Sequence, residues 1–259
     1  MDDATLSRLD AALAGPRPID LGRTRVDATL RCAVLAPHPD DFDAIGIVMR
    51  RLHTAGHEIH VAVLTSGWTG VDTGWNGAET PAIKTALRIE EQRRSCGFFG
   101  LPPERLRFLE LREDEQAHQL DDAPNHAAVK GYLADLRPHA VFLPHGNDSN
   151  IAHQRTYAMM RSAVALAKLD VRAFLNRDAK TLGMRGDAYV SFDADEARWK
   201  AELLRFHASQ QARNLRARQR GFDDRVLDLN ATAARELSLD APYAEVFQLQ
   251  AFHRGELLE

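Results

Sequence analysis

Two features of the sequence predict an α/β fold with a mostly parallel sheet. Short apolar runs alternate with longer stretches whose apolar residues recur at helical spacing. The runs at 33–36 and 140–143 are continuous, which is typical of strands buried on both faces of a parallel sheet. Because strands that alternate with helices form right-handed βαβ units, we expect helices to cover the sheet.

The order of the elements follows from these patterns. Continuous or alternating apolar runs predict the strands, and apolar residues at helical spacing predict the helices. The expected strands lie at 31–37, 59–65, 106–109, 140–143, 171–175, 189–192 and 243–249. The expected helices lie within 1–30, between the end of the first strand and residue 55, and at 80–99, 122–136, 156–168, 193–206 and 208–237.

Residues at the ends of these stretches support the assignments. Pro81 falls in the first turn of its helix, and Gly56 lies just beyond the end of another, where glycine is common. We expect Asp41 or Asp43 to cap the helix after the first strand, because carboxylates are favoured at a helix N-terminus.

The composition is that of an ordinary globular chain with a sizeable core. Of 259 residues, 44% are hydrophobic and 27% are charged, and the net charge of −4 gives no reason to expect nucleic acid as a partner. The acidic start, Met1-Asp2-Asp3, lacks the apolar segment of a secretory signal, and no apolar run approaches the ~20 residues of a membrane span. Cys32 and Cys96 fall in an expected strand and an expected helix, so we expect reduced cysteines and a cytoplasmic location.

A stiff, polar turn follows the first expected strand. Two prolines bracket His38, and carboxylates follow at Asp40, Asp41 and Asp43. The carboxyl end of a strand is where open α/β sheets usually bind ligands. The turn is therefore either a capped connection between strand and helix or half of a metal site. In the second case one aspartate would bind the metal and the other would take a proton from bound water, since a catalytic zinc has three protein ligands and a position for water.

A second apolar strand is followed by His145, Asp148 and His153. Because the ends of parallel strands meet at one edge of a sheet, we expect His153 to complete a metal site with His38 and Asp41. The alternative for His153 is a helix-start histidine that donates to backbone. His145 is an alternative or additional ligand, a group that orients substrate, or a histidine of a surface loop. Asp148 contacts substrate, holds a metal-binding histidine in place, or caps the next helix.

Two of three further segments have both a structural and a functional interpretation. Trp68 lies in a glycine-rich loop that forms either a mobile surface or the rim of a binding site, where it would contact substrate. The arginine-rich segment at 205–220 forms a solvated helix face, or it meets an anionic substrate group or a second subunit. The helix at 80–99 has a charged face that is expected to be mostly solvated. The charged residues of that face are Lys84, Arg88, Glu91 and Arg94.

Several familiar site motifs are absent from the sequence. There is no G-x-G-x-x-G after the first strand, no Walker A loop and no G-x-S-x-G elbow, which disfavours dinucleotide binding and serine hydrolase chemistry. Metal-assisted hydrolysis remains, because zinc lowers the pKa of bound water to about 7 and polarises a scissile carbonyl.

Five segments together resemble the LmbE-like (PIG-L) family of zinc-dependent N-acetylglucosaminyl deacetylases. The most specific is 36–43, which matches the family's (A/P)-H-P-D-D-x-[ED]. Segment 148–155 is similar to D-S-H-P-D-H-R-A, and 87–91 is similar to R-x-x-E. Near the end of the chain, 200–210 is similar to K-x₆-[HY]-x-S-Q, and 243–247 is similar to Y-A-E-x-F.

The resemblance implies a fold and a site. The fold is a Rossmann-like three-layer α/β sandwich with a mostly parallel sheet, formed as one domain with a core at about 31–176 and a smaller C-terminal part at about 177–259. Asp40 would be the general base, and Arg88 would contact the sugar. The ligands of Zn²⁺, or of another divalent metal, would be His38, Asp41 and His153.

The sequence departs from the family pattern at two positions. The family's histidine three residues before the last ligand is Asn150 here, and the aspartate just before that ligand is Ala152. The family histidine helps to polarise the carbonyl and to stabilise the oxyanion. Asn150 can donate a hydrogen bond but cannot carry charge or pass on a proton. Loss of one oxyanion donor typically costs about 10²–10³ in rate, so either His145 or another group substitutes, or the activity is weak or directed at another amide.

The sequence thus predicts a zinc-dependent hydrolase that removes the N-acetyl group from an N-acetylglucosamine-type sugar or glycoside. Asp40 would deprotonate metal-bound water, and a nearby polar donor would stabilise the oxyanion. Two other hypotheses stay open. The first is a non-catalytic sugar- or metal-binding protein, which Asn150 and Ala152 make plausible. The second is a nucleotide-binding protein, against which the missing glycine motif argues. The expected partner is a small amino-sugar substrate, and the resemblance favours a homo-oligomer.

Overall fold

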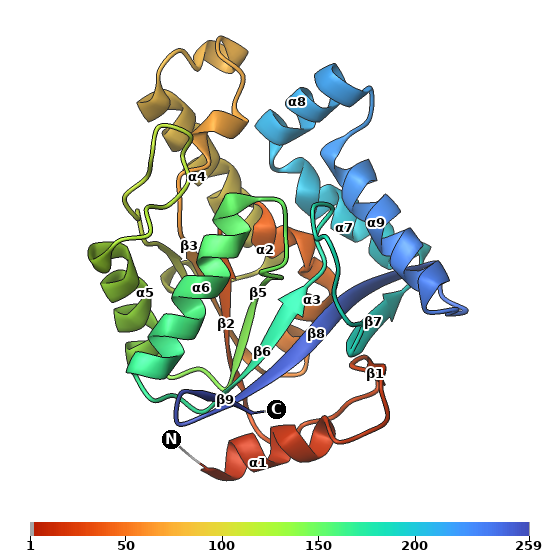
Figure 1. The fold of residues 1–259 in the computed structure, drawn as a ribbon. Coiled ribbons are helices and arrows are strands. Elements are labelled where there is room, and N and C mark those ends of the chain that lie inside the picture. The colour runs from red at the N-terminus through yellow and green to blue at the C-terminus, as the bar shows by residue number, and fades with distance from the viewer. Residues whose placement is uncertain (1–2, 259) are drawn as a thin grey trace.

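The computed structural model describes residues 3–258 and has helices on both faces of one sheet (Figure 1). The described strands form a nine-stranded sheet in the order β1-β7-β8-β6-β5-β2-β3-β4, with β9 paired to β8. Most neighbouring strands are parallel, and the exception is β8, which is antiparallel to β6, β7 and β9. The prediction of an α/β fold with a mostly parallel sheet is confirmed. Met1 and Asp2 of the acidic N-terminal stretch lie outside the described residues.

The elements have the following bounds. The strands are β1 (Ile19–Asp20), β2 (Arg31–Ala36), β3 (Glu58–Val63), β4 (Leu106–Phe108), β5 (Ala140–Pro144), β6 (Val171–Asn176), β7 (Ala188–Phe192), β8 (Tyr243–His253) and β9 (Glu256–Leu258). The α-helices are α1 (Asp3–Ala12), α2 (Asp41–Ala44), α3 (Gly46–Thr54), α4 (Pro81–Phe99), α5 (Ala123–Leu136), α6 (Ile151–Leu166), α7 (Ala194–Arg205), α8 (Ala208–Arg218) and α9 (Phe222–Glu236).

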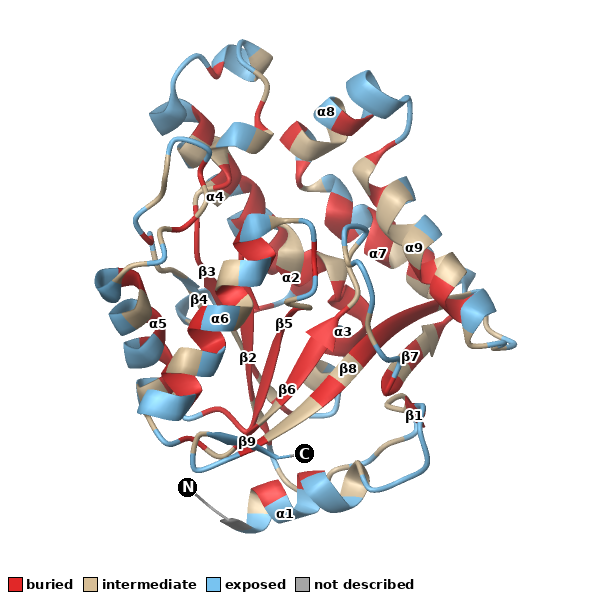
Figure 2. Ribbon diagram, in the orientation of Figure 1, coloured by how far each residue is buried: buried red, intermediate tan, exposed pale blue. Residues whose placement is uncertain are grey.

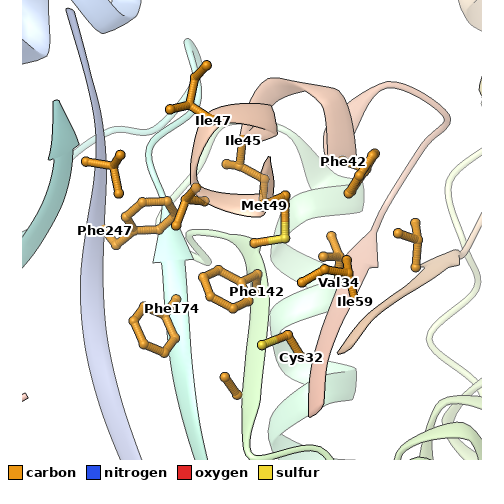
Figure 3. Packing of buried hydrophobic residues seen from close by; sticks show 14 of the residues in the cluster. Cys32, Val34, Phe42, Ile45, Ile47, Met49, Ile59, Phe142, Phe174 and Phe247 are labelled. Carbon is orange, nitrogen blue, oxygen red and sulfur yellow. The ribbon is translucent and has the colours of Figure 1, made fainter. Parts of the chain in front are cut away.

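Each face of the central strands has its own hydrophobic core, because successive side chains of a strand point to opposite faces. Figure 3 shows one core, in which Val34 and Phe142 meet Ile45 and Met49 of the α2–α3 segment. Val141 points to the other face, where α5 and α6 pack. β5 is buried along its whole length (Figure 2). The two cores therefore hold the carboxyl ends of β2 and β5, from which the candidate site turns emerge, in fixed positions.

The C-terminal part of the chain completes the same sheet. β8 enters between β6 and β7, and α9 packs on it through a small core that includes Ala233 and Val246. In Figure 1, α8 and α9 rise beside the carboxyl ends of the parallel strands, across from the segment that precedes α4. The sheet is continuous across residue 176, where the expected core and C-terminal part meet.

Two expected helices are interrupted. The helix after the first strand is split at Ile45 into α2 and α3, and the helix expected near the C-terminus is split into α8 and α9 by a turn at Gln219, which has a positive φ of 56°. The expectation that Asp41 or Asp43 caps α2 is wrong. The N-cap position belongs to Asp40, whose side chain makes no capping hydrogen bond, and the other two carboxylates have partners elsewhere.

The expectation that the charged face of α4 is solvated is wrong for three of its four residues. Lys84, Arg88 and Glu91 are buried, whereas Arg94 is exposed. Nζ of Lys84 donates to the hydroxyl of Thr73 at 2.8 Å. Arg88 and Glu91 belong to the candidate site described below.

Both cysteines are free and buried, as expected. Within residues 3–258, no helix combines the length and the apolar character needed to cross a membrane.

A fully buried ion pair joins the C-terminal part to the segment after the first strand end. Nζ of Lys200 lies 2.7 Å from Oε1 of Glu245, and the two side chains are 0% and 1% exposed. Lys200 also donates to the carbonyl of Ala44 at 2.7 Å. Glu245 accepts the backbone N–H groups of Ile47 and Val48 in the first turn of α3. Because both charges are hydrogen-bonded, the pair ties α3 to α7 and β8.

Replacing Lys200 by methionine is expected to lower the free energy of unfolding by about 3–5 kcal/mol, because the charge of Glu245 would stay buried without its partner. Arg198→Met is the matched control on the same helix, since Arg198 and Asp195 form an exposed pair, which contributes little. Urea unfolding followed by circular dichroism measures both variants. Small, equal losses would show that the buried pair does not stabilise this junction.

Candidate metal centre and active site

The turn after β2 directs two adjacent aspartates to different partners. Asp40 has a positive φ of 116°, which residues other than glycine rarely adopt. Oδ2 of Asp41 accepts the backbone N–H of His38 at 2.8 Å and lies 3.2 Å from its Nδ1. Oδ2 of Asp40 instead lies 2.8 Å from Nη2 of Arg88. The two neighbouring carboxylates can therefore have separate roles.

The structure brings His38, Asp41 and His153 together. His153 lies in the first turn of α6, and its Nε2 is 3.7 Å from Oδ1 of Asp41. The ring centroids of the two histidines are 5.9 Å apart. One possible ligand atom from each of the three residues lies within 4.8 Å of the others. At this spacing, one ion can contact all three residues.

The electrostatics around these three residues favour a cation. Burial disfavours the Asp41 carboxylate, but hydrogen bonds from His38 and the charge of His153 lower its pKa to about 2. Burial also disfavours a charged His153, but Asp148, Asp41 and Asp178 raise its pKa to about 9. Three carboxylates thus surround this imidazole with negative charge, which a bound cation would neutralise. Two imidazoles and one carboxylate are a usual donor set of catalytic zinc, so these residues fit a divalent metal.

Two carboxylates approach the other ring nitrogen of His153. Nδ1 is buried without a well-aligned hydrogen bond, with Oδ2 of Asp148 at 3.3 Å and Oδ1 of Asp178 at 3.9 Å. Asp148 accepts the backbone N–H of Asn150 and the hydroxyl of Thr181. Carboxylates in this position orient metal-binding histidines. The same three side chains, from Asp148, His153 and Asp178, also form a second group whose ligand atoms lie within 4.8 Å of one another. Asp178 was not expected, although it follows the end of β6.

Asp40 begins a buried chain of charged groups. Nη2 of Arg88 donates to Asp40 and to the carbonyl of Pro39, and Nη1 lies 3.4 Å from Oε2 of Glu91. Glu91 accepts the backbone N–H and the hydroxyl of Ser209 at 2.6 and 2.7 Å. Burial raises the pKa of Asp40, and Arg88 opposes this shift. Arg88 also lines the pocket, so the residue expected to contact sugar has Asp40 as its nearest charged partner.

A second buried network supports the backbone of the same turn. Oε1 of Gln92 accepts the N–H of Asp40 at 2.9 Å, and its Nε2 donates to Asp43 at 3.0 Å. Asp43 also accepts the hydroxyl of Ser95 at 2.8 Å and lies 2.7 Å from Nε2 of His207. These side chains are buried. His207, in a segment that resembles a family motif, therefore supports the turn and does not line the pocket.

A pocket of about 360 Å³ opens beside the candidate ligands and also contains Asp40 and Asn150. Oδ1 of Asn150 accepts the backbone N–H of Ala152 at 3.1 Å and so caps α6. Its amide Nδ2 has no acceptor among the described residues, which leaves two N–H donors for a ligand. His118 lines the pocket as well, from a loop in which no sequence pattern marked it.

His145 and Trp68 do not line this pocket. Nδ1 of His145 accepts the backbone N–H of Asn147 at 3.0 Å, and Nε2 lies 3.1 Å from Oε1 of Gln248. Both ring nitrogens are therefore occupied, and the structure does not place His145 where it could replace the family histidine. Trp68 lies with its ring centroid 5.8 Å from Nζ of Lys84. The neighbours of Trp68 in the loop line the pocket, but its own side chain does not.

Comparison with solved structures shows the same fold in three proteins of low sequence identity. N,N'-diacetylchitobiose deacetylase from Pyrococcus horikoshii is 17% identical, with a TM-score of 0.73 over 98% of this chain and 94% of that chain. GalB, the 4-carboxy-2-hydroxymuconate hydratase from Pseudomonas putida KT2440, is 18% identical, with a TM-score of 0.65 over 85% and 96% of the two chains. The zinc inhibited form of teicoplanin deacetylase Orf2 is 14% identical, with a TM-score of 0.58 over 85% and 98%.

No functionally curated protein matches the chain in sequence. A family model does match: PIG-L, GlcNAc-PI de-N-acetylase, aligns with residues 33–164, just over half of the chain. The matched residues include the turn after β2 and the segment that leads into α6. Through this match, the resemblance found in the motifs is confirmed, and the chain belongs to the PIG-L family.

Proposed function

We propose that the protein is a metal-dependent hydrolase that removes the N-acetyl group from an N-acetylglucosamine-type sugar or glycoside. The observation that carries the proposal is the position of Asp40 in one pocket with His38, Asp41 and His153. Membership of the PIG-L family supports it, and so do the two deacetylases among the proteins of similar fold. The GalB hydratase shows that the fold alone does not decide the reaction.

His38, Asp41 and His153 would hold the metal, and Asp148 would orient His153 through Nδ1. A divalent ion held by these residues would supply Lewis-acid chemistry, which polarises a carbonyl and lowers the pKa of bound water to about 7. Two imidazoles and a carboxylate suit zinc, and we propose Zn²⁺ or another divalent metal as the cofactor.

Asp40 would accept a proton from the attacking water. Arg88 donates a hydrogen bond to Oδ2 of Asp40. Oδ1 of Asp40 accepts no hydrogen bond from the described residues, so this oxygen is available to water in the pocket. After attack on the acetyl carbon, the protonated carboxyl would return the proton to the leaving amine. Arg88 would thus act on the reaction by holding Asp40, in addition to any contact with the sugar.

Asn150 would donate to the oxyanion. Its carbonyl oxygen is fixed by the cap of α6, which directs the amide nitrogen away from the helix backbone. A preorganised donor of this kind stabilises the charge that develops on the acetyl oxygen. Because asparagine cannot transfer a proton, the acid role would remain with Asp40 alone.

Non-catalytic sugar or metal binding is not favoured, because binding alone gives no reason for a carboxylate with a free oxygen beside the candidate ligands. The substrate would be a small amino sugar or its glycoside. The buried, free Cys32 and Cys96 support a cytoplasmic location. The single-domain organisation and a homo-oligomer remain predictions.

Substitution of His153 by alanine should abolish tight zinc binding, and Asp148→Asn should weaken it by about 10–100-fold, the usual effect of an outer partner. Competition with a chromogenic zinc chelator measures both affinities on metal-stripped protein. His145→Ala is the matched control, because His145 also follows β5 but is bonded to Gln248 and Asn147. A loss of affinity in His145→Ala but not in His153→Ala would contradict the ligand assignment.

Asp40→Asn is expected to lower kcat for acetate release by about 10²–10⁴-fold, the usual contribution of a general base. The amide keeps the size of the side chain and can still accept from Arg88, so the zinc content should stay the same. Acetate release from methyl N-acetylglucosaminide and metal analysis on the same sample provide the two readouts. Full activity of the zinc-loaded variant would exclude Asp40 as the base.

Asn150→Ser keeps an oxygen that can cap α6 but removes the amide donor. We expect kcat to fall by about 10²–10³-fold, as for the loss of one oxyanion donor. Asn150→Ala removes the cap as well and should lower the free energy of unfolding by a further ~0.5–2 kcal/mol. If the serine variant releases acetate at the original rate, Asn150 has only the structural role of a cap.

A further inference from the structure

The C-terminal part of the chain gives the pocket a basic wall. We define this basic wall as Arg213 of α8, Arg225 of α9 and Lys180 in the loop between β6 and β7, all of which line the same pocket as His38 and His153. Figure 1 shows α8 and α9 above the carboxyl ends of the parallel strands. A molecule whose acetamide reaches the candidate ligands would therefore lie with another part beside these cations.

No residue of the basic wall forms an ion pair with a carboxylate of the described chain. Nη1 of Arg213 donates to the carbonyl of Thr69 at 3.3 Å, and Nη1 of Arg225 donates to Oδ1 of Asn214 at 2.9 Å. The ammonium of Lys180 has no hydrogen bond to any of residues 3–258. Both acceptors are neutral, so these hydrogen bonds bring no negative charge to the three cations.

This lack of a carboxylate partner is not general among the arginines near the pocket. Arg177 also lines the pocket, but it is bound to Glu236. Three arginines that lie outside the pocket are each paired with a carboxylate. These pairs are Arg205 with Asp223, Arg216 with Asp72, and Arg220 with Asp228.

Arg225 is the informative member of the basic wall because it is half-buried. Burial lowers its pKa, and nearby Arg218 lowers it further, but a guanidinium stays charged in proteins. A partly buried charge costs free energy unless an opposite charge or hydrogen bonds compensate it. Asp178 and Asp40 act on Arg225 through their charge, but neither forms an ion pair with it, because their closer partners are His153 and Arg88.

We propose that the basic wall binds an anionic group of the substrate, a carboxylate or a phosphate, attached to the sugar away from its N-acetyl group. The inference rests on the proposed function, since it specifies the class of N-acetylated substrate. Guanidinium groups suit both anions because their N–H donors form paired bonds to two oxygens. The basic wall lies outside residues 33–164, so the family match does not account for it.

The test compares kcat/KM for acetate release by the zinc-loaded protein on three sugars. These are N-acetylglucosamine 1-phosphate, the N-acetylglucosaminide of glycolic acid and the neutral glycolamide counterpart of the second. We expect an anionic sugar to be preferred over the neutral one by about 10–100-fold, the effect of one or two charge-assisted hydrogen bonds. The better of the two anionic sugars identifies phosphate or carboxylate as the recognised group.

Variants connect the preference to the basic wall. Arg225→Met and Arg213→Met should each bring the ratio of anionic to neutral kcat/KM toward one, whereas Arg225→Lys should retain part of it because the charge remains. Arg220→Met is the matched control, since it removes an arginine that pairs with Asp228 outside the pocket and should leave the ratio unchanged.

Calorimetric titration of the zinc-loaded protein with glucosamine 1-phosphate and with methyl glucosaminide tests the basic wall without turnover. Tighter binding of the phosphate, lost in Arg225→Met, would support the inference. Equal kcat/KM on charged and neutral sugars, with equal affinity for the two probes, would overturn it and leave the proposed function intact. No acetate release from any sugar would count against the proposed function, and the titration alone would then decide whether the wall binds anions.

Discussion

The backbone conformation at Asp40 is the constraint on which the site depends. A non-glycine residue with φ of 116° is strained by about 1–3 kcal/mol. Gln92 holds this conformation by accepting the Asp40 N–H, while Arg88 holds the side chain. With this geometry, Asp41 turns back to His38, and Asp40 turns to Arg88. The strained residue therefore separates a candidate ligand from a candidate base that is adjacent to it in sequence.

The support for this turn comes from the far end of the chain. His207 contacts Asp43 beneath the turn, and Ser209 is bonded to the chain of charges that begins at Asp40. Glu245 of β8, paired with Lys200 of α7, accepts two backbone N–H groups at the start of α3. The late segments that resemble family motifs thus contribute buried hydrogen bonds and not candidate ligands. Buried hydrogen bonds of this kind make a site rigid, although Nε of Arg88 and Nδ1 of His207 have no hydrogen-bond partner among the described residues. The same C-terminal part supplies the basic wall of the pocket.

Local patterns were sufficient to predict most strands, and the three candidate ligands, because continuous apolar runs and proline-bracketed turns mark the strand ends. Long-range pairings were not predictable. Arg88 is buried because Asp40, on another element, compensates its charge, and His145 is turned away from the pocket by Gln248. The alternating pattern of β8 predicted a strand but not its antiparallel place between β6 and β7. The two-residue β1 and the C-terminal β9 carry too little pattern to be recognised.

We expect one divalent ion to be held between the ends of β2 and β5. Anomalous diffraction at the zinc edge, from crystals of the zinc-loaded protein, tests it most directly. The expected result is one strong peak at about 2.0–2.2 Å from a nitrogen of His38, an oxygen of Asp41 and a nitrogen of His153. A peak among Asp148, His153 and Asp178 instead, or no peak in the pocket, would contradict it.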